Sequence, residues 1–322
     1  MFEEIFGRNI KHQDVLLQTM GSITVITLIV ITTVEFIFGN VGNGVIALVI
    51  SIDWAKRGTI SSIDQILTAL AISRIVLLWL MFIHLFVFVS NQGFLVSGKG
   101  IRMFNNSCIV TSHFSIWLAT CLSIFYFLKI ANFSNSIFLY LKWRVKKVVS
   151  VILLVSLIPL LCNLVLVNIH MDAWVDTYKR NTTSLNNSAR YFKLLLLINT
   201  MFTLIPFTMS LITFLLLIFS LCRHLRIMQH DAQGPRDAST KAHITALQSV
   251  IAFLLLYAIF ILSYLIPVFI SDLVNKNVLL MFFQATGIAF PSGHSGVLIL
   301  GNNKLRQASL SVLWWLRHKF RQ

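Results

Sequence analysis

Long apolar stretches separated by short polar segments run along the chain. Stretches without Asp, Glu, Lys or Arg cover residues 75–98, 103–128, 148–171, 194–222, 242–271 and 277–303, and a further stretch, 15–52, is interrupted only by Glu35. A helix needs about 20 mostly apolar residues to cross a hydrocarbon layer roughly 30 Å thick. The strands of a membrane barrel have only about 10 residues and alternate in polarity. The pattern therefore predicts membrane-spanning helices near 24–50, 64–89, 106–129, 148–169, 193–221, 244–270 and 278–300.

These spans define the expected fold class, an all-α membrane protein with a seven-transmembrane helix bundle and a short amphipathic C-terminal helix. We expect residues 1–23 to form an extracellular N-terminus, 24–300 the bundle and 301–322 a cytoplasmic tail. Residues 1–19 are charged and lack the apolar core of a signal peptide, so the first span is expected to act as an uncleaved signal anchor.

The tail segment 304–321 has the composition of an interfacial helix. Its apolar face consists of Leu310, Leu313 and Trp314, and its basic residues include Arg317, Lys319 and Arg321. A helix of this kind lies in the membrane surface with its basic side chains among the lipid headgroups. Membrane lipid is therefore an expected partner of the tail.

Composition excludes several classes of protein. Of 322 residues, 57% are hydrophobic and only 11% are charged, whereas soluble domains have roughly 25% charged residues. A soluble globular protein, a disordered chain, a collagen and a coiled coil are excluded. Zinc-protease, nucleophile-elbow and phosphate-binding glycine motifs are absent, and the nine histidines are scattered. The sequence therefore predicts no enzyme, no metal site and no cofactor.

Basic residues are unevenly divided between the two alternating sets of loops. Segments 51–63, 129–147, 222–243 and 301–322 hold 16 Lys and Arg residues, the opposite segments hold nine, and Arg74 completes the 26. Cytoplasmic loops carry the excess of Lys and Arg in membrane proteins. The excess predicts a cytoplasmic C-terminus and an extracellular N-terminus, as an odd number of spans requires. We attribute the net charge of +15 to loops that face anionic lipid, and predict no nucleic-acid partner.

Glycan acceptor patterns occur in the longest predicted outer loop, near 170–192. Asn181 begins one such pattern and is the main candidate, whereas Asn186 is a weaker one. Asn105 also fits the pattern but lies at the membrane edge. Asn132 fits too, yet the predicted orientation places it in the cytoplasm, where it would not be glycosylated.

The cysteines and the glycine clusters are interpreted as packing residues. No cysteine falls within 170–192, so a disulfide from the third span to that loop is impossible. We interpret the four cysteines as small apolar packing residues; they are Cys108, Cys121, Cys162 and Cys222. Glycines at 39–44 and 293–296 lie within spans, where small residues let helices approach closely.

Several polar residues lie within the spans, where they are costly and indicate a role. They are Glu35, Asn40, Asn43, Ser73, Arg74, His294 and Ser295. For Asn40, Asn43, Ser73 and Arg74 we favour hydrogen bonds between helices that fix the bundle. A proton or ion pathway would need more acidic residues than Glu35 alone, and the chain has no internal repeat. A channel or transporter remains the alternative class.

A set of motifs resembles one receptor family. The motifs occupy residues 70–74 (LAISR), 125–134 (FYFLKIANFS), 206–211 (PFTMSL), 220–224 (SLCRH), 237–243 (DASTKAH) and 294–302 (HSGVLILGN). This combination resembles the type 2 (bitter) taste receptors, a family of seven-helix G-protein-coupled receptors, over about residues 30–316. The signatures of rhodopsin-class receptors are missing, and vomeronasal type 1 receptors are the nearest relatives to exclude. Members of the family begin a few residues before the first helix, so residues 1–19 are interpreted as an extension before Met20.

The resemblance implies a ligand site for small bitter molecules in the outer half of the bundle. On matching positions its residues are Trp79, Cys108, Ser112, His113, Phe202, Phe260, Tyr264 and Gln284. Cys108 stands where the family often has a tryptophan, so one aromatic ring on which a ligand could stack is missing. An aromatic site with few polar groups suits bitter compounds, because apolar area favours transfer and one or two hydrogen bonds orient the ligand.

The resemblance also implies a cytoplasmic site for a heterotrimeric G protein, gustducin or a related inhibitory-type alpha subunit. Its candidate residues are Tyr126 and Lys129 at the end of the third span and His224 at the end of the fifth. The expected location is the plasma membrane. The sequence leaves the agonists and the formation of oligomers open.

Overall fold

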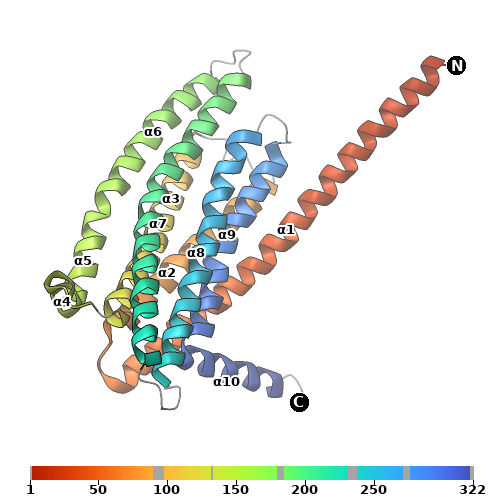
Figure 1. Ribbon diagram of the computed structural model, residues 1–322. Coiled ribbons are helices and arrows are strands. Elements are labelled where there is room, and N and C mark those ends of the chain that lie inside the picture. Colours follow the sequence, from red (N-terminus) through yellow and green to blue (C-terminus); the bar gives the residue numbers. More distant parts are fainter. Residues whose placement is uncertain are drawn as a thin grey trace.

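The computed structural model describes residues 2–89, 98–131, 133–179, 185–230, 238–270 and 276–319, and these residues form helices without a strand (Figure 1). The helices are α1 (Phe2–Arg57), α2 (Ser62–Val89), α3 (Gly98–Ile130), α4 (Ser136–Trp143), α5 (Val145–Val155), α6 (Leu157–Lys179), α7 (Leu185–His230), α8 (Ala238–Ile270), α9 (Lys276–Gly301) and α10 (Asn303–Lys319). We call the half of the bundle nearer α10 the inner half and the other half the outer half.

Each predicted span coincides with helix. The first three lie in α1, α2 and α3, the fourth covers α5 and α6, and the last three lie in α7, α8 and α9. Within the described residues, five stretches are long and apolar enough to cross a membrane: Ile23–Arg57, Ser62–Val87, Arg102–Ile130, Val145–Asp172 and Lys193–Ser220. A shorter apolar helix covers Val250–Ile266. The expected all-α membrane bundle is confirmed.

The fourth span is broken where the sequence predicted one continuous helix. A turn at Ser156 separates α5 from α6. Pro159 lies three residues later and has no N–H group, so the Val155 carbonyl loses its partner within the helix. The Ser156 hydroxyl bonds back to the Leu153 carbonyl at 2.7 Å, which satisfies a second carbonyl at the break.

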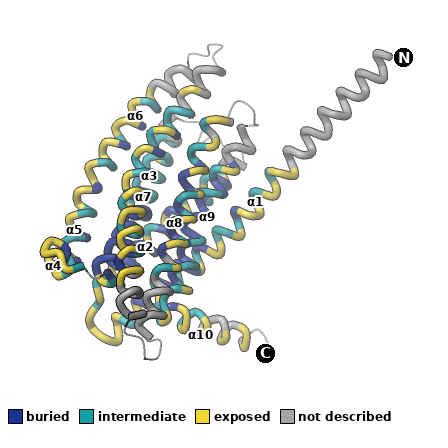
Figure 2. The backbone as a smooth tube through the Cα atoms, viewed as in Figure 1, coloured by how far each residue is buried: buried dark blue, intermediate teal, exposed yellow. Residues whose placement is uncertain are grey.

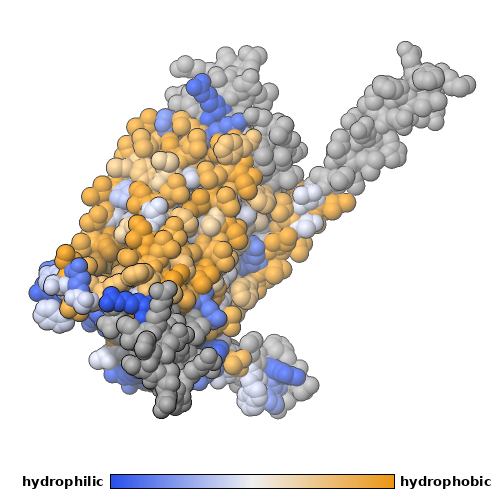
Figure 3. Space-filling model, in the orientation of Figure 1, coloured by the Kyte–Doolittle hydropathy of each residue, from blue (hydrophilic) through white to orange (hydrophobic). Residues whose placement is uncertain are grey.

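Apolar side chains cover the outside of the bundle. Figure 2 shows exposed residues on the outward faces of the helices, and Figure 3 shows that the face in view is largely hydrophobic between more polar ends. Exposed examples are Leu215, Phe219, Leu255 and Ile259 on α7 and α8. A soluble monomer rarely presents apolar area on this scale, so the surface is one that lipid would cover.

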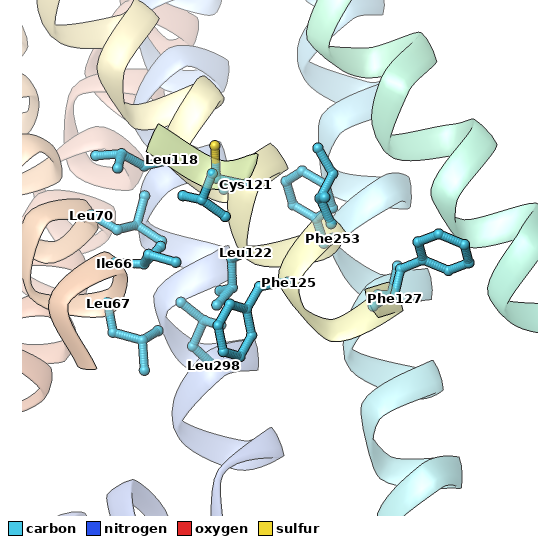
Figure 4. Packing of buried hydrophobic residues seen from close by; sticks show 14 of the residues in the cluster. Ile66, Leu67, Leu70, Leu118, Cys121, Leu122, Phe125, Phe127, Phe253 and Leu298 are labelled. Atoms are coloured by element: carbon cyan, nitrogen blue, oxygen red, sulfur yellow. The ribbon is translucent and has the colours of Figure 1, made fainter. Parts of the chain in front are cut away.

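The apolar core lies in the inner half. Side chains of α2, α3 and α9, among them Leu70, Leu122, Phe125 and Leu298, gather around the middle of the bundle (Figure 4). α3 has the longest buried run, from Ser115 to Phe125. α3 is surrounded by other helices there and is therefore the central helix of the bundle.

Small residues allow α1 to approach α9 closely. A methyl group added at Gly39 would overlap the Ser292 hydroxyl and lie 2.8 Å from Leu78 of α2. The Ser292 hydroxyl itself donates to the Glu35 carbonyl at 2.9 Å. The packing interpretation of this glycine cluster is confirmed for Gly39, whereas Gly44 faces open space.

The two ends of the chain leave the bundle in different ways. α1 is one helix of 56 residues that begins at Phe2 and leans away from the other helices toward its start (Figure 1). α10 extends sideways from the inner end of α9, below α1 (Figure 1), and the side chain of Asn302, just before it, accepts from the Lys304 N–H at 3.0 Å. Leu310 and Trp314 of α10 are exposed, as the interfacial interpretation expects. The side chain of Leu313 and residue Arg321 lie outside what the structure describes.

Candidate functional site

A polar centre joins α2, α3 and α9 in the middle of the bundle. The Arg74 side chain is 0% exposed, and its guanidinium contacts Ser115 of α3 and His294 of α9. The Arg74 Nε atom lies 3.4 Å from the Ser115 hydroxyl, and Nη2 bonds to His294 Nδ1. Since an arginine can only donate, Nδ1 of His294 accepts and its proton is on Nε2. The expected role of Arg74 in joining helices is present in the structure.

The other polar residues of the spans divide between two kinds of contact. Ser295 of α9 donates to the Asn43 side chain of α1 at 2.8 Å, which links two helices as expected. Asn40 instead bonds to the Phe36 carbonyl at 2.9 Å, and Ser73 bonds to the Leu70 carbonyl at 2.9 Å. These two hydrogen bonds stay within one helix, because the carbonyl one turn back is the nearest acceptor for a short side chain.

A second polar group surrounds Pro206 inside α7. The proline has no N–H, so the Phe202 carbonyl, four residues earlier, loses its partner within the helix. The Tyr257 hydroxyl of α8 donates to the Thr203 carbonyl at 2.8 Å. The Ser210 hydroxyl donates to the Thr120 hydroxyl of α3 at 3.0 Å. This proline therefore marks the point where α7 is joined to both α3 and α8.

The outer half contains a polar group on α2 and α9. The Gln284 side chain is 4% exposed, and its Nε2 donates to the Met81 carbonyl. Its Oε1 lies 3.4 Å from His84 Nδ1, so that nitrogen donates. The His84 ring stacks on Phe104 of α3 with ring centres 4.4 Å apart. The remaining nitrogen of His84, Nε2, is then free of a proton and can accept a hydrogen bond.

A column of aromatic rings runs from this group toward the polar centre. Tyr264 of α8 contacts Phe283 of α9, with ring centres 4.6 Å apart, and Phe260, at 4.9 Å. Phe260 stacks on Phe290 at 5.1 Å. Phe290 lies under the guanidinium of Arg74, with the Cζ atom 5.9 Å from the ring centre. The column therefore connects the outer half to the centre through direct contacts between α8 and α9.

The residues that the resemblance implied for the ligand site do not all meet. Phe260, Tyr264 and Gln284 belong to the outer groups on α8 and α9, and Cys108 of α3 is partly buried. Trp79 packs instead against Phe36 of α1, with ring centres 5.2 Å apart, and half of its surface is exposed.

His113 also contacts a different part of the bundle. Its Nε2 lies 3.2 Å from the Ser156 hydroxyl at the break between α5 and α6. Ser112 of α3 and Phe202 of α7 are partly buried. The structure thus places His113 at the junction of α3 with the broken fourth span.

Three residues of the outer groups were missed by sequence reasoning: His84, Phe104 and Phe283. His84 could have been found, because it is a polar residue within a span, which is the signal that identified Arg74. The two phenylalanines gave no such signal, since the spans contain many phenylalanines.

The inner half holds the candidate coupling residues Tyr126 and Lys129 of α3. Tyr126 is partly buried, and Lys129 is exposed with its Nζ 6.0 Å from the centre of the Phe125 ring. α4 covers the end of α3, because Lys142 donates to the Ala131 carbonyl at 3.0 Å. The side chain of His224 in α7 lies outside what the structure describes.

The glycosylation candidates also fall where the structure describes little. Asn181 lies outside the described residues, and Asn186 lies in α7 without a described side chain. The described residues contain no group of three or more His, Cys, Asp or Glu side chains suited to a metal ion. The four cysteines are free thiols.

Comparison with known proteins identifies the class of this helical membrane bundle. The chain matches the taste receptor protein (TAS2R) family over residues 20–317. It is 54% identical to taste receptor type 2 member 140 of Rattus norvegicus over 296 residues, covering 91% of this chain and 95% of that protein. It is 54% identical to taste receptor type 2 member 14 of Homo sapiens over 305 residues, covering 94% of this chain and 96% of that protein.

These matches cover nearly the whole bundle and the tail. The protein is a multi-pass membrane receptor, and not an enzyme. The chain belongs to the type 2 taste receptor family, the bitter taste receptors among the G-protein-coupled receptors. Small-molecule ligands and G proteins are therefore its classes of partner.

Proposed function

We propose that bitter agonists bind in the outer half of the bundle, between the His84–Gln284 group and the Tyr264–Phe283 pair. The observation that carries this proposal is that His84 contacts both Phe104 and Gln284, with the Tyr264–Phe283 pair next to Gln284 along α9. His84 and Gln284 are hydrogen-bonded to each other, while the aromatic rings supply apolar area. A few polar groups among aromatic side chains are typical of sites for small organic ligands.

The hydrogen-bond pattern favours a particular kind of agonist. The Gln284 amide already donates to Met81 and accepts from His84. His84 Nε2 is therefore the acceptor left for a ligand, and the Tyr264 hydroxyl is a second polar group. We infer that an aromatic agonist with an O–H or N–H donor fits best. Cys108, Ser112, Phe202 and Phe260 are proposed as the margins of the site, whereas Trp79 and His113 contact other parts of the bundle.

Activation would follow a shift in population between two arrangements of the helices. An agonist activates only if it binds the active arrangement better than the inactive one. A ligand against Tyr264 would act on α8 and α9 together, because the aromatic column joins these helices. Tyr257, whose ring centre lies 5.4 Å from that of Phe290, holds α7 through the Thr203 carbonyl. These contacts supply a physical route by which binding can change how α7, α8 and α9 pack.

On the opposite side, we propose that Tyr126, Lys129 and His224 couple to gustducin or a related inhibitory-type alpha subunit. The excess of basic residues supports an extracellular N-terminus and a cytoplasmic C-terminus at the plasma membrane. The exposed apolar side chains of α10 support its contact with the inner leaflet.

One cell assay tests the ligand site and the coupling separately. Cells that express the receptor and an inhibitory-type alpha subunit are screened for agonists, and the calcium response is measured. Gln284→Leu should raise the agonist concentration for half-maximal response by about tenfold, because His84 loses the acceptor that orients its ring and keeps Nε2 free for the agonist. Thr286→Ala on the same helix is the control, because that hydroxyl bonds only to carbonyls of its own helix.

Coupling is tested by Tyr126→Ala and Lys129→Ala, with agonist binding and surface level measured alongside. The proposal expects reduced G-protein activation with agonist binding preserved. Unchanged signalling in both variants would remove these residues from the coupling site, and loss of surface level alone would give Tyr126 a packing role.

A further inference from the structure

α4 exposes an apolar and aromatic face at the edge of the bundle. The sequence predicts a loop between the third and fourth spans, yet Ser136–Trp143 forms a helix that projects from the side of the bundle where α5 begins (Figure 1). Most of its residues are exposed (Figure 2). The exposed apolar and aromatic side chains are Ile137, Leu139, Tyr140 and Trp143, of which Trp143 is 80% exposed.

The packing of α4 fixes which of its faces is exposed. Phe138 is buried against Phe127 of α3 and against Phe133, with ring centres 5.6 and 5.1 Å apart. At the end of the helix, Lys142 Nζ donates to the Ala131 carbonyl at 3.0 Å. One side of α4 is therefore attached to the inner end of α3, and the opposite side faces outward.

α4 lies at the level where the apolar surface of the bundle ends. The part of the fourth span that is long and apolar enough to cross a membrane begins at Val145, two residues after Trp143. Exposed apolar side chains continue from there along α5, with Val151 and Leu154. Tyrosine and tryptophan are enriched at the boundary between hydrocarbon and water, because their rings are apolar and carry one polar group. The exposed face of α4 is therefore continuous with the surface that lipid would cover.

Basic side chains without acidic partners follow this face directly. Arg144, Lys146 and Lys147 are exposed. The sequence has no Asp or Glu between Asp64 and Asp172, and the ion pairs among the described residues involve none of these three basic side chains. Clusters of Lys and Arg next to a membrane-spanning helix attract anionic lipid.

The guanidinium of Arg144 is held by the two aromatic rings. Its Cζ atom lies 5.2 Å from the centre of the Tyr140 ring and 5.5 Å from that of Trp143. In the described part of the chain its N–H groups donate no hydrogen bond. Arginine binds phosphate oxygens through two parallel hydrogen bonds. The aromatic face of α4 therefore carries a positioned donor for a phosphate.

We propose that α4 is a membrane-docking helix for the leaflet nearer α10. Its exposed aromatic face enters the interfacial layer, and the basic residues at its end bind the phosphate of an anionic phospholipid headgroup. Because the buried side of α4 contacts α3, a bound lipid also holds the inner end of α3, where the candidate coupling residues lie. In the orientation proposed above this leaflet is the cytoplasmic one, but docking depends neither on that orientation nor on the agonist site.

Insertion is tested by fluorescence quenching of the purified full-length receptor in phosphatidylcholine nanodiscs. The discs contain lipid brominated either near the headgroup end of the acyl chains or near their tips. The difference between the wild type and Trp143→Phe isolates the signal of Trp143, which bromine near the headgroup should quench more strongly. Trp117→Phe is the control, because the Trp117 side chain is 5% exposed and its signal should resist both lipids.

Headgroup binding is tested by hydrogen exchange of 136–147 in nanodiscs with increasing phosphatidylserine, which should slow the exchange. One basic residue near an anionic surface strengthens the attraction about fivefold. Arg144→Gln should therefore need about fivefold more phosphatidylserine for the same protection. Arg190→Gln removes an exposed arginine at the opposite end of the bundle and should behave like the wild type. Both arginines are exposed, so neither substitution removes buried packing.

Three results would overturn the proposal. The first is a Trp143 signal that neither brominated lipid quenches. The second is protection of 136–147 that does not change with phosphatidylserine, or that responds equally in Arg144→Gln and Arg190→Gln. The third is protection that requires added heterotrimeric G protein, because the exposed face of α4 would then belong to a protein partner.

Discussion

The Tyr257 hydroxyl of α8 donates a hydrogen bond of 2.8 Å to the Thr203 carbonyl of α7, three residues before Pro206. Tyr257 is 0% exposed, so the bond lies in the interior of the bundle. The N–H four residues after Thr203 belongs to Phe207, so the helix can still use this carbonyl, and the tyrosine bonds to its second lone pair. The bond therefore links α8 directly to the backbone of α7 close to Pro206.

Removal of this hydroxyl should loosen the contact between α7 and α8. We expect Tyr257→Phe to lower the stability of the purified receptor by about 0.5–1.5 kcal/mol, since one hydrogen bond between the two helices is lost. Thermal unfolding measures the change. Tyr140→Phe, on the exposed side of α4, is the control and should leave the melting temperature unchanged. Equal melting temperatures for the wild type and Tyr257→Phe would show that the bond contributes nothing.

The contact of α1 with α9 depends on the absence of a side chain at Gly39. Gly39→Ala should destabilise the receptor by about 1–3 kcal/mol, because the new methyl group meets the Ser292 hydroxyl and Leu78. Gly44→Ala provides a matched control on the same helix. Its methyl group meets nothing within 4 Å, and alanine favours the helix by about 1 kcal/mol. The account fails if both alanines have the same effect on thermal unfolding or surface level.

The contact between α1 and α10 should depend on pH. The hydrogen bond from Lys304 to Asp53, 2.7 Å long, lowers the pKa of this carboxyl below its ordinary value. A lowered pKa in the folded state means that the contact stabilises the protein above the ordinary pKa of aspartate. This stabilisation is lost as the pH falls through the lowered pKa. Protection of 303–319 from hydrogen exchange, relative to the intrinsic exchange rate at each pH, should therefore fall in acid, and Asp53→Asn should show the lower protection already at neutral pH.

The control for this prediction is Arg57→Gln, which removes the other basic partner of Asp53 and leaves Lys304 in place. Exchange of α10 at neutral pH should be nearly unchanged in this variant. The same exchange rates in Asp53→Asn and the wild type would show that packing of the buried Leu305 alone holds α10.

The proposed orientation predicts one main glycan. Asn181 should carry it, because the segment near 170–192 is expected outside the cell, whereas Asn132 should not. Glycosidase treatment of Asn181→Gln should then no longer shift its mobility, and Asn132→Gln should behave like the wild type. A shift that survives Asn181→Gln and disappears in Asn132→Gln would reverse the orientation.

The spans could be predicted from the sequence because each one is a long run without charges, and such a run has one outcome in a membrane. The break at Ser156 could also have been predicted, because Pro159 lacks an N–H group and interrupts the fourth span. Asn43 was expected to join helices, and it does so through Ser295. Asn40 and Ser73 were predicted to join helices, and yet each bonds to its own backbone.

The candidate site was less predictable, because a membrane helix is apolar on every side. Its sequence therefore does not reveal which face meets the bundle and which meets lipid. Trp79 and His113 lie at suitable depth, but their rings turn toward α1 and toward α5 and α6. Tyr264 and Gln284 were predicted from the family resemblance. His84 is identified by the structure alone, through its contact with Gln284 between α2 and α9.

The central claim is that His84 accepts a hydrogen bond from agonists in the outer half of the bundle. The most direct test is the agonist dose response of His84→Phe, which keeps a ring to stack on Phe104 and removes both nitrogens. His170→Phe on α6 is the control, and surface levels are matched. We predict about tenfold or greater loss of potency for agonists with an O–H or N–H donor, and unchanged potency in the control. Unchanged potency of every agonist at His84→Phe would contradict the account.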